Sequence, residues 1–561
     1  KVKMIYIDPP YNTGNDFIYN DDFSVESGVW RAESGDYDEQ GNRLVKNLES
    51  NGRFHTDWLN MLYPRLRLTR DLLTDDGVIF ISIDDNEQAN LKKICDEIFG
   101  ESNFIGNIII KSNPRGSQSV SELAQQHEYL LIYSKNIYTA NIVGFELTTD
   151  MENEYKYEDE NGRYRLLGLR QRGGFWRRSE RPSLYYPIFL NEHTGELFLN
   201  NSNGEYYEIL PIQPSTMIDG SWRWSKEKFE NEKNLLIAKQ VNRNETIVWD
   251  VFQKDYLKTG ESKKKTKAKS LWDDKEVNYQ NGSIEIKELF DNDNIFSYSK
   301  PIYLIKKAIQ MVDTNDSIIL DFFSGSATTA HAVMQLNAED GGKRKFIMVQ
   351  LPEKCDEKSE AYKVGYKNIC EIGKERIRRA GTKIVEEQAH LLSAVKSGAF
   401  EKGKSFAQFT NSESAKAAQA EIRKTLDVGF RVLKLDSSNM QDVYYNPATV
   451  SQTLLDATID NIKPDRTPLD LLFQVMLELG VPLSAKIEEN AVNGKTYYAV
   501  NGNDIIACFD EDIDEEVITE IAKQQPLYAV FKDQSFASDS VAINNEQLFK
   551  TYSPATVIKV I

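Results

Sequence analysis

The sequence has few of the features that mark secreted, membrane-spanning or metal-binding proteins. Its four cysteines are scattered without the spacing of a disulfide framework or a metal site: Cys95, Cys355, Cys370 and Cys508. No stretch approaches the roughly 20 apolar residues of a membrane span, and the chain does not open on a basic-then-apolar signal segment. We therefore expect a soluble, cytoplasmic protein with no metal site and no membrane contact.

Acidic residues outnumber basic ones by 86 to 68, and the resulting net charge of −18 argues against nucleic-acid binding by the surface as a whole. Two segments nevertheless concentrate basic residues. The first interleaves arginine with aromatic residues, which favours nucleic-acid binding; the second is a lysine run, for which a solvated face is an equal alternative. The candidate DNA contacts are Arg163, Arg165, Arg170, Arg172, Arg177, Arg178, Lys263, Lys264 and Lys265.

A chain of 561 residues is too long for one hydrophobic core. Buried strand patterns alternate with amphipathic helices over residues 1–140, this rhythm breaks over 141–295, and it returns over 296–400. We expect one Rossmann-like α/β sheet interrupted by an inserted recognition domain, followed by an α+β domain over 401–561. Because Lys1 is not an initiator methionine and a strand pattern follows at once, we expect the chain to begin inside a domain.

Periodic apolar residues predict the individual elements. Helices are expected over 58–73, 91–99 and 471–479, with Pro301 in the first turn of another. Strands are expected over 78–83, 317–320, 346–349, 527–531 and 557–561, and an Asn501-Gly502 turn joins strands over 497–500 and 505–509. Trp222 and Trp224 either stack on DNA or pack in a core, and Asp85 or Asn86 is expected to cap the helix that follows.

Asp8-Pro9-Pro10-Tyr11 follows directly after a predicted strand. Ligands bind at this end of strands in open α/β sheets, and the two prolines stiffen the backbone there. The Asp8 carboxylate and the Pro9 carbonyl then offer two acceptors that can hold both hydrogens of one NH₂ group. Tyr11 offers a flat face on which an extruded base can stack.

A second polar loop, Asp321–Thr329, follows the predicted strand 317–320 and opens a helix. Its small residues let a cofactor approach the backbone, and the helix N-terminus favours polar ligand groups. The spacing is not that of the Gly-x-Gly-x-x-Gly dinucleotide fingerprint. The loop alone therefore predicts a cofactor site without naming the cofactor.

Together the two motifs resemble amino-methyltransferases in which the target-base motif precedes the cofactor motif. Further segments make the chain similar over its whole length to the modification (Mod) subunits of type III restriction–modification systems. These segments are Ile5–Gly14, Gly77–Asp85, His127–Tyr129, Arg181–Pro187, Trp222–Ser225, Lys300-Pro301, the Asp321 loop, Gly429–Asp436 and Val530–Asp533.

The resemblance implies an adenine-specific DNA methyltransferase that uses S-adenosylmethionine. It assigns Asp8, Pro9, Pro10 and Tyr11 to the target adenine. It assigns the cofactor to Lys300, Pro301, Asp321, Phe322, Phe323, Ser324, Gly325, Ser326, Thr328, Thr329 and Gln350. Either Gln350 or Glu353 contacts the ribose. Ala327 stands where family loops often have glycine, so we expect a backbone angle there that an L-residue tolerates.

The resemblance also implies double-stranded DNA, a second copy of the chain and a nuclease–helicase restriction subunit as partners. It places a further sheet element upstream of Lys1. Two alternatives stay open: methylation of the exocyclic amine of cytosine, and a role mainly in DNA recognition for the nuclease partner. A carbon-5 cytosine methyltransferase is excluded, because it needs a thiolate, usually in a Pro-Cys pair, and no cysteine here follows a proline.

Overall fold

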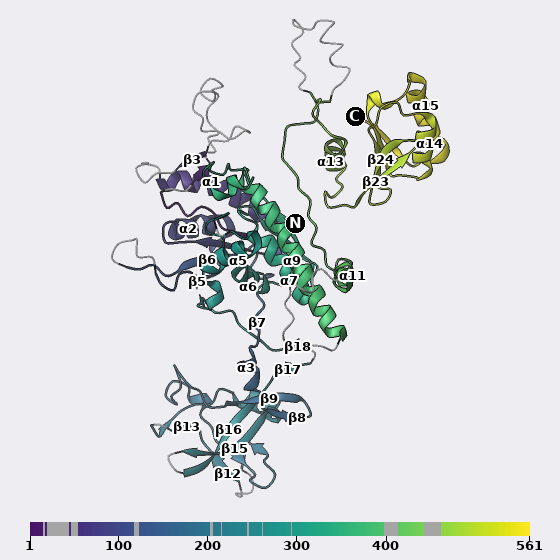
Figure 1. The fold of residues 1–561 in the computed structure, drawn as a ribbon. Coiled ribbons are helices and arrows are strands. Elements are labelled where there is room, and N and C mark those ends of the chain that lie inside the picture. Colours follow the sequence, from purple (N-terminus) through teal and green to yellow (C-terminus); the bar gives the residue numbers. More distant parts are fainter. Residues whose placement is uncertain are drawn as a thin grey trace. The chain divides into compact units, whose positions relative to one another are not determined.

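The computed structural model describes most of the chain as two compact units, Lys1–Gly429 and Phe430–Ile561 (Figure 1). Among the described residues, no helix is long and apolar enough to cross a membrane. The described residues are 1–14, 17–19, 44–46, 54–116, 123–201, 206–214, 216–243, 246–260, 262–292, 294–397, 413–441 and 462–561.

The described part of the first unit contains a seven-stranded sheet. In spatial order its strands are β20 (Leu271–Trp272), β5 (Phe104–Ile110), β6 (Glu128–Ser134), β4 (Leu73–Ile83), β1 (Val2–Ile7), β21 (Ile318–Asp321) and β22 (Lys345–Met348). Strand β1 pairs in parallel with β4 and β21, and β21 pairs in parallel with β22. Only β6 runs against its two neighbours. The predicted, largely parallel α/β sheet is therefore confirmed.

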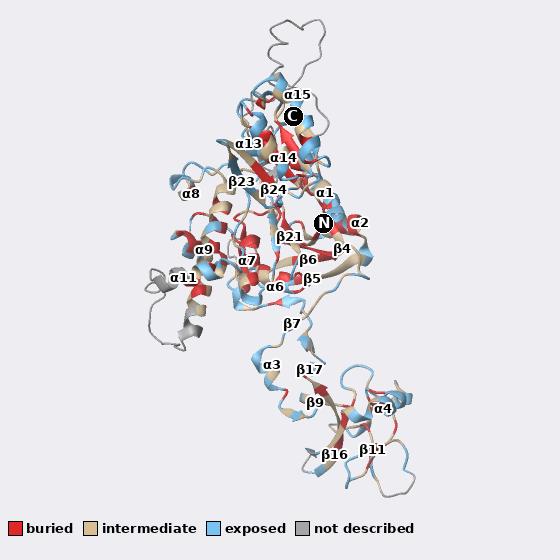
Figure 2. Ribbon diagram, turned by 90° about the vertical axis from the view of Figure 1, so that its right-hand side faces the viewer, coloured by how far each residue is buried: buried red, intermediate tan, exposed pale blue. Residues whose placement is uncertain are grey.

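Helices cover both faces of this sheet. On one face Ile5 and Ile79 pack against α1 (Phe54–Leu72) and α2 (Gln88–Phe99). On the other face Met4 and Phe80 pack against α6 (Ile302–Gln310) and α7 (Thr328–Asp340). Side chains alternate across a strand, so neighbouring residues of one strand enter different cores. Figure 2 shows buried positions gathered in these strands and in α6 and α7.

Three further helices complete the described part of this region: α5 (Gln280–Phe290), α8 (Glu360–Lys363) and α9 (Ile369–Ser397). Helix α11 (Glu413–Ile422) follows them. The predicted helix around Pro301 begins one residue later, at Ile302, with Pro301 as its N-cap. The strand expected over 78–83 is longer than predicted, because β4 already begins at Leu73.

The segment after β6 folds into small sheets of its own. A four-stranded sheet has the order β15 (Leu236–Arg243), β16 (Thr246–Tyr256), β9 (Gly162–Gly168) and β8 (Tyr157–Asp159). A three-stranded sheet has the order β11 (Leu197–Phe198), β10 (Ile188–Leu190) and β12 (Tyr207–Ile209). Shorter elements are β7 (Phe145–Glu146), α3 (Thr149–Asn153), β13 (Ile212–Gln213), β14 (Ile218–Asp219), α4 (Lys226–Glu232), β17 (Lys258–Thr259), β18 (Ser262–Lys263) and β19 (Lys265–Thr266).

The end of the predicted insertion belongs to the main sheet. Trp272 of β20 and Val277 pack in the same core as Met4. The domain limits taken from the sequence remain a prediction. Trp222 and Trp224 are buried in the core of the inserted segment, where they pack with Phe229 and Val251, so the core alternative for these tryptophans holds.

The second unit is an α/β sandwich around a five-stranded sheet. Its strands, in spatial order, are β23 (Ile487–Val492), β24 (Lys495–Val500), β25 (Ile505–Cys508), β26 (Tyr528–Phe531) and β27 (Val557–Val560). Helix α13 (Pro468–Glu478) packs on one face, and α14 (Glu515–Lys523) and α15 (Asp539–Tyr552) pack on the other. The predicted turn joins β24 to β25, with φ of +49° at Asn501 and +84° at Gly502.

Candidate active site

The segment Asp8–Tyr11 follows the carboxyl end of β1, and hydrogen bonds hold its backbone in place. Trp58 of α1 donates a hydrogen bond from Nε1 to the Pro10 carbonyl at 2.7 Å. Asn12 is buried, has a left-handed φ of +59°, and donates from Nδ2 to Glu87 Oε1 at 2.6 Å. These contacts fix the turn, so the two acceptors at Asp8 and Pro9 sit on a rigid backbone.

The Asp8 carboxylate faces the ammonium of Lys300. Asp8 Oδ1 lies 3.2 Å from Lys300 Nζ in an ion pair, and it receives no hydrogen bond within the described part of the chain. Burial raises the pKa of Asp8, although Lys300 opposes this by favouring the carboxylate. The oxygen therefore keeps an acceptor position that a substrate N–H can fill.

Tyr11 is held by hydrogen bonds on both sides of its hydroxyl. It donates to Glu128 Oε2 at 2.8 Å and accepts from Lys300 Nζ at 2.7 Å. Tyr279 donates to the same Glu128 oxygen at 2.5 Å. Burial and the nearby carboxylates raise the pKa of both tyrosines, so they remain neutral donors.

The second polar loop leaves the carboxyl end of β21. Asp321 is buried, and its carboxylate accepts from Phe323 N at 3.1 Å and from Thr329 Oγ1 at 2.6 Å. Burial raises the pKa of Asp321 to about 7. The carboxylate thus ties the start of the loop to the first turn of α7 and shapes the loop around it.

Gly325 of this loop contacts Gln350, which follows β22. Gly325 has a left-handed φ of +49°, and its N–H donates to Gln350 Oε1 at 2.7 Å. A Cβ at Gly325 would lie 3.4 Å from Phe296 Cζ. The Gln350 amide in turn donates to Glu353 Oε1 at 3.3 Å. Gln350 therefore holds the loop in shape.

Ala327 has a left-handed backbone, with φ of +62° and ψ of +39°. The sequence predicted an angle that an L-residue tolerates, and this small allowed region is tolerated at a cost. The tight turn into α7 imposes the angle, since Ala327 is the N-cap of that helix. A left-handed alanine costs roughly 1–2 kcal/mol relative to an ordinary conformation.

Arg376 of α9 is fully buried and was not a candidate from the sequence. Its Nη1 donates to Ser299 Oγ at 2.8 Å, to Ser326 Oγ at 2.7 Å and to Thr328 Oγ1 at 2.6 Å. Burial lowers the pKa of Arg376 to about 10, so it stays charged at neutral pH. The one signal in the sequence is its position four residues after Ile372, on the apolar side of the helix.

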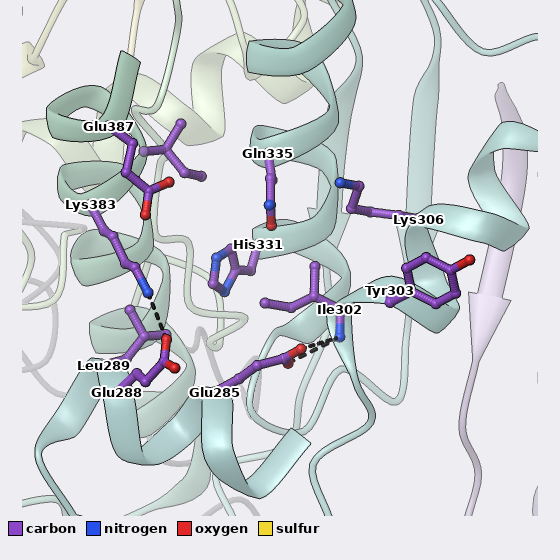
Figure 3. Close-up of a pocket in the computed structure, with 11 residues that line it drawn as sticks. Glu285, Glu288, Leu289, Ile302, Tyr303, Lys306, His331, Gln335, Lys383 and Glu387 are labelled. Carbon is purple, nitrogen blue, oxygen red and sulfur yellow. Dashed lines mark hydrogen bonds and ion pairs between the residues drawn. The ribbon is translucent and has the colours of Figure 1, made fainter. Parts of the chain in front are cut away.

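A side chain of α5 holds the segment before α6 in place. Glu285 accepts from Ile302 N at 3.1 and 3.0 Å, as Figure 3 shows, and lies 3.7 Å from Arg376. Burial raises the pKa of Glu285 to about 7. Glu285 and Ile302 line the pocket drawn in Figure 3, and His331 of α7 points into it. Burial lowers the pKa of this histidine. These contacts hold Lys300 and Pro301 beside both polar loops.

The two polar loops leave neighbouring strands side by side. Ile5 of β1 is paired with Leu320 of β21, so Asp8 and Asp321 both emerge at the carboxyl edge of the sheet. The loop fits a cofactor such as S-adenosylmethionine, because a glycine, which has no side chain to block close approach to the backbone, lies beside the N-terminus of α7. Lys300 is an exception among the predicted cofactor residues, because its ammonium reaches Asp8 and Tyr11 instead.

The lysines predicted to contact DNA are paired with carboxylates: Lys263 with Glu152, Lys264 with Asp255, and Lys265 with Glu146 at 3.2 Å. Three of the predicted arginines also have acidic partners. Arg165 lies 2.9 Å from Asp255, Arg178 lies 2.9 Å from Asp219, and Arg170 pairs with Asp250. The pairs of Lys263, Lys265 and Arg178 are at least partly exposed and contribute little to stability, so these cations can exchange a carboxylate for a phosphate. Asp255, the partner of both Arg165 and Lys264, is buried.

Arg170 departs from the prediction. The sequence places it among the DNA contacts, but the structure leaves it only 7% exposed, in an ion pair with Asp250 at 2.9 Å. Arg163 is exposed and donates to backbone carbonyls. Arg172 and Arg177 are exposed and have no carboxylate partner within the described ranges. Among the predicted DNA contacts in the described residues, Arg172 and Arg177 are therefore the freest cations.

The N-cap of α2 is Glu87, with no side-chain cap, so the cap expected at Asp85 or Asn86 is wrong. Residues 398–405 match the pattern Gly-x-x-x-x-Gly-Lys-Ser letter by letter and lie outside the described residues.

The comparisons with known proteins agree on one family. A family model described as DNA methylase matches residues 2–380. The EcoPI Mod subunit, a type III restriction-modification enzyme of Escherichia phage P1, is 36% identical over 67% of this chain and 58% of its own length. The type II methyltransferase M.KpnI of Klebsiella pneumoniae is 35% identical over 66% of this chain and 80% of its own length.

The EcoP15I Mod subunit of Escherichia coli is 34% identical over 68% of this chain and 60% of its own length. The chain thus spans somewhat more than half the length of the two Mod subunits. The family model ends before the second unit. The resemblance that the sequence shows at Gly429–Asp436 and Val530–Asp533 therefore stays a prediction.

Proposed function

This chain belongs to the N6/N4 DNA methylase family, and we propose that it transfers a methyl group from S-adenosylmethionine to the exocyclic amine of adenine in double-stranded DNA. One observation carries the proposal: the Asp8 and Asp321 loops leave neighbouring parallel strands at the same edge of the sheet. Ligands bind at this edge in open α/β sheets. Two substrates can therefore be held next to each other.

In this proposal the residues after β1 hold the target base. Asp8 and the Pro9 carbonyl accept the two hydrogens of the amine, which turns the nitrogen lone pair away from the ring. Tyr11 stacks on the base after it leaves the helix, a step that costs a few kcal/mol. The rigid anchoring of the turn by Trp58 keeps both acceptors in place.

The residues after β21 hold the cofactor. Asp321 and Gly325 lie in this loop. The hydroxyls of Ser326, Thr328 and Thr329 fix its turn into α7 through Arg376 and Asp321, and Gln350 keeps it in shape. S-adenosylmethionine supplies, when bound, a methyl group that is already activated on a sulfonium. Positioning the amine and excluding water therefore contribute more than acid or base groups.

Asp as the first residue of the base motif, rather than Ser, favours adenine over cytosine. The exocyclic amine of cytosine remains the second candidate, because it presents the same two hydrogens. The inserted segment supports DNA reading: Arg172 and Arg177 are exposed cations near Trp176, whose ring lies 5.6 Å from the Arg177 guanidinium. Arginine of this kind contacts phosphates or guanine edges.

We also infer partners from the relatives, two of which are named as Mod subunits of type III enzymes. The chain would then act as a homodimer that recognises DNA for a nuclease–helicase subunit. Light scattering of the full-length protein tests the dimer, with a monomer mass as the contradicting result. Co-purification with a restriction subunit encoded beside it tests the second partner.

The direct experiment is transfer of a labelled methyl group from S-adenosylmethionine to DNA by the purified full-length protein. Wild type should label DNA. Asp8→Ala should reduce labelling at least about 100-fold, as expected for loss of a preorganised acceptor, while cofactor binding measured by calorimetry stays within about twofold. An Asp8→Ala protein with wild-type activity would remove Asp8 from the site, and an unlabelled product with wild type would overturn the proposed function.

A further inference from the structure

Lys300 is the centre of a buried cluster around the base-binding motif. Its ammonium lies 3.2 Å from Asp8 Oδ1, 2.7 Å from the Tyr11 hydroxyl and 3.3 Å from Glu128 Oε2. Asp8 and Tyr11 lie in the turn after β1, and Glu128 is the first residue of β6, whereas Lys300 lies two residues before α6. One side chain thus connects distant segments of the first unit at the acceptor of the target amine.

Two aromatic rings enclose the same ammonium. Lys300 Nζ lies 4.7 Å from the centre of the Tyr11 ring and 4.2 Å from that of Tyr279. Cations are attracted to aromatic faces, more strongly where water is excluded. Burial alone lowers the pKa of Lys300, but the carboxylates of Asp8 and Glu128 raise it overall, so the group is a cation at neutral pH.

Glu128 competes with Asp8 for this cation. It also accepts hydrogen bonds from Tyr11 and Tyr279. Because the Tyr11 hydroxyl is bonded to both Glu128 and Lys300, the plane of its ring is set before any base arrives. The cluster therefore controls both parts of the base site, the acceptor and the stacking face.

We propose that Lys300 and Glu128 are positioning residues for the target base. Lys300 holds Asp8 as an ionised acceptor, and Glu128 pairs with the same ammonium and fixes Tyr11 by a hydrogen bond. This inference rests on the proposed methyl transfer and deepens it. It moves Lys300 from the cofactor, where the resemblance places it, to the base. The reason is that its ammonium contacts two atoms of the base motif, Asp8 Oδ1 and the Tyr11 hydroxyl, and also Glu128, which binds Tyr11.

The charges around Asp8 decide the direction of the effect. The groups that face it are Tyr6, Tyr11, Glu128, Tyr279, Lys300 and Asp321. Within the described residues Lys300 is the one cation among them. A protonated Asp8 would donate a hydrogen to the amine instead of accepting one. Removing Lys300 should therefore protonate Asp8 at higher pH, and removing the charge of Glu128 should do the reverse.

The test is whether the two substitutions shift the pH profile of the rate in opposite directions. In Lys300→Met the acid limb of the single-turnover rate should move to higher pH by about 1–3 pH units, the range for loss of one close opposite charge. In Glu128→Gln the acid limb should move to lower pH, since a repelling carboxylate is gone and Asp8 is the one carboxylate left to pair with Lys300. Lys300→Arg, which keeps the charge, should restore most of the wild-type profile.

Lys307→Met is the matched control. Lys307 is also largely buried, pairs with Asp274, and lies 4.8 Å from the ring of Trp272. It therefore shares the chemistry of Lys300 without touching the base motif. Its variant should keep the wild-type midpoint of the pH profile. Calorimetry with S-adenosylmethionine should show unchanged affinity for both Lys300→Met and Glu128→Gln.

A second readout does not depend on activity. The ¹³C signal of the Asp8 carboxyl, assigned by its absence in Asp8→Asn, reports the pKa of Asp8 directly. The inference predicts a higher pKa in Lys300→Met and a lower one in Glu128→Gln. If both variants leave the pKa of Asp8 unchanged, or if Lys300→Met mainly weakens cofactor binding, the inference is overturned while the methyl transfer stands. If wild type transfers no methyl group, the proposed function fails, and the ¹³C titration still decides this point.

Discussion

Nη1 of Arg376 lies 2.6 Å from Oγ1 of Thr328, and this buried hydrogen bond joins the long helix α9 to the first turn of α7. The same nitrogen reaches Ser299 and Ser326. One guanidinium thus connects the loop after β21 with the segment that carries Lys300. The shape of the loop after β21 depends on a residue about 50 positions further along the chain.

Arg376→Met should destabilise the first unit by about 1.5–3 kcal/mol, the range for hydrogen bonds to a charged group. All seven tryptophans precede residue 430, so tryptophan fluorescence during urea unfolding reports this unit alone. Arg378→Met, on the same helix but with a side chain 56% exposed, is the control and should change stability by less than about 0.5 kcal/mol. Equal stability of the two variants would contradict the role given to Arg376.

Ala327→Gly should stabilise the first unit by up to about 1 kcal/mol. Glycine removes the roughly 1–2 kcal/mol cost of a left-handed alanine, and part of this gain is lost because glycine makes the unfolded chain more flexible. The same urea unfolding measures the change. A destabilised Ala327→Gly protein would show that Ala327 does not have the backbone angle described.

Gly325→Ala should weaken S-adenosylmethionine binding at least about tenfold. The added Cβ would obstruct the close approach of the proposed cofactor to this backbone, and φ of +49° strains any L-residue. The control is Gly341→Ala at the end of α7, which has φ of +73° and no neighbour within 4 Å of an added Cβ. Both variants pay the backbone strain, and calorimetry should show weaker binding only for Gly325→Ala. Normal cofactor affinity in that variant would place the cofactor elsewhere.

Arg172→Ala and Arg177→Ala should lower affinity for DNA or relax the sequence that is methylated, by about 1–3 kcal/mol for each base contact. Phosphate contacts would weaken all sequences alike and flatten the dependence on salt. Arg170→Ala should instead destabilise the fold, because it leaves Asp250 buried without its partner. Binding titrations at several salt concentrations separate these cases. Unchanged DNA binding in both exposed-arginine variants would move recognition out of the inserted segment.

The sequence predicted well what depends on local patterns. Apolar periodicity located helices such as α2 and strands such as β21, and the Asp8 and Asp321 motifs met because both follow parallel strands of one sheet. The sequence did not predict the long-range polar contacts. Glu128 and Lys300 are far apart in the chain, and only the completed fold brings both to Asp8.

The sequence also did not predict the left-handed backbone of Ala327 or the burial of Arg170. Ala327 adopts a left-handed angle because the turn into α7 requires it, whatever the residue prefers. Arg170 looked like its exposed neighbours in the sequence, yet β16 supplies Asp250 as its buried partner. Both cases depend on contacts with distant segments, which composition and periodicity do not contain.

The most direct test of the account is to identify the methylated base. DNA treated with the full-length protein and S-adenosylmethionine carrying a labelled methyl group is digested to nucleosides and separated by liquid chromatography with mass detection. The account predicts the label in N6-methyladenine with wild type and its loss with Asp8→Ala. Label in N4-methylcytosine, or in no base at all, would contradict it.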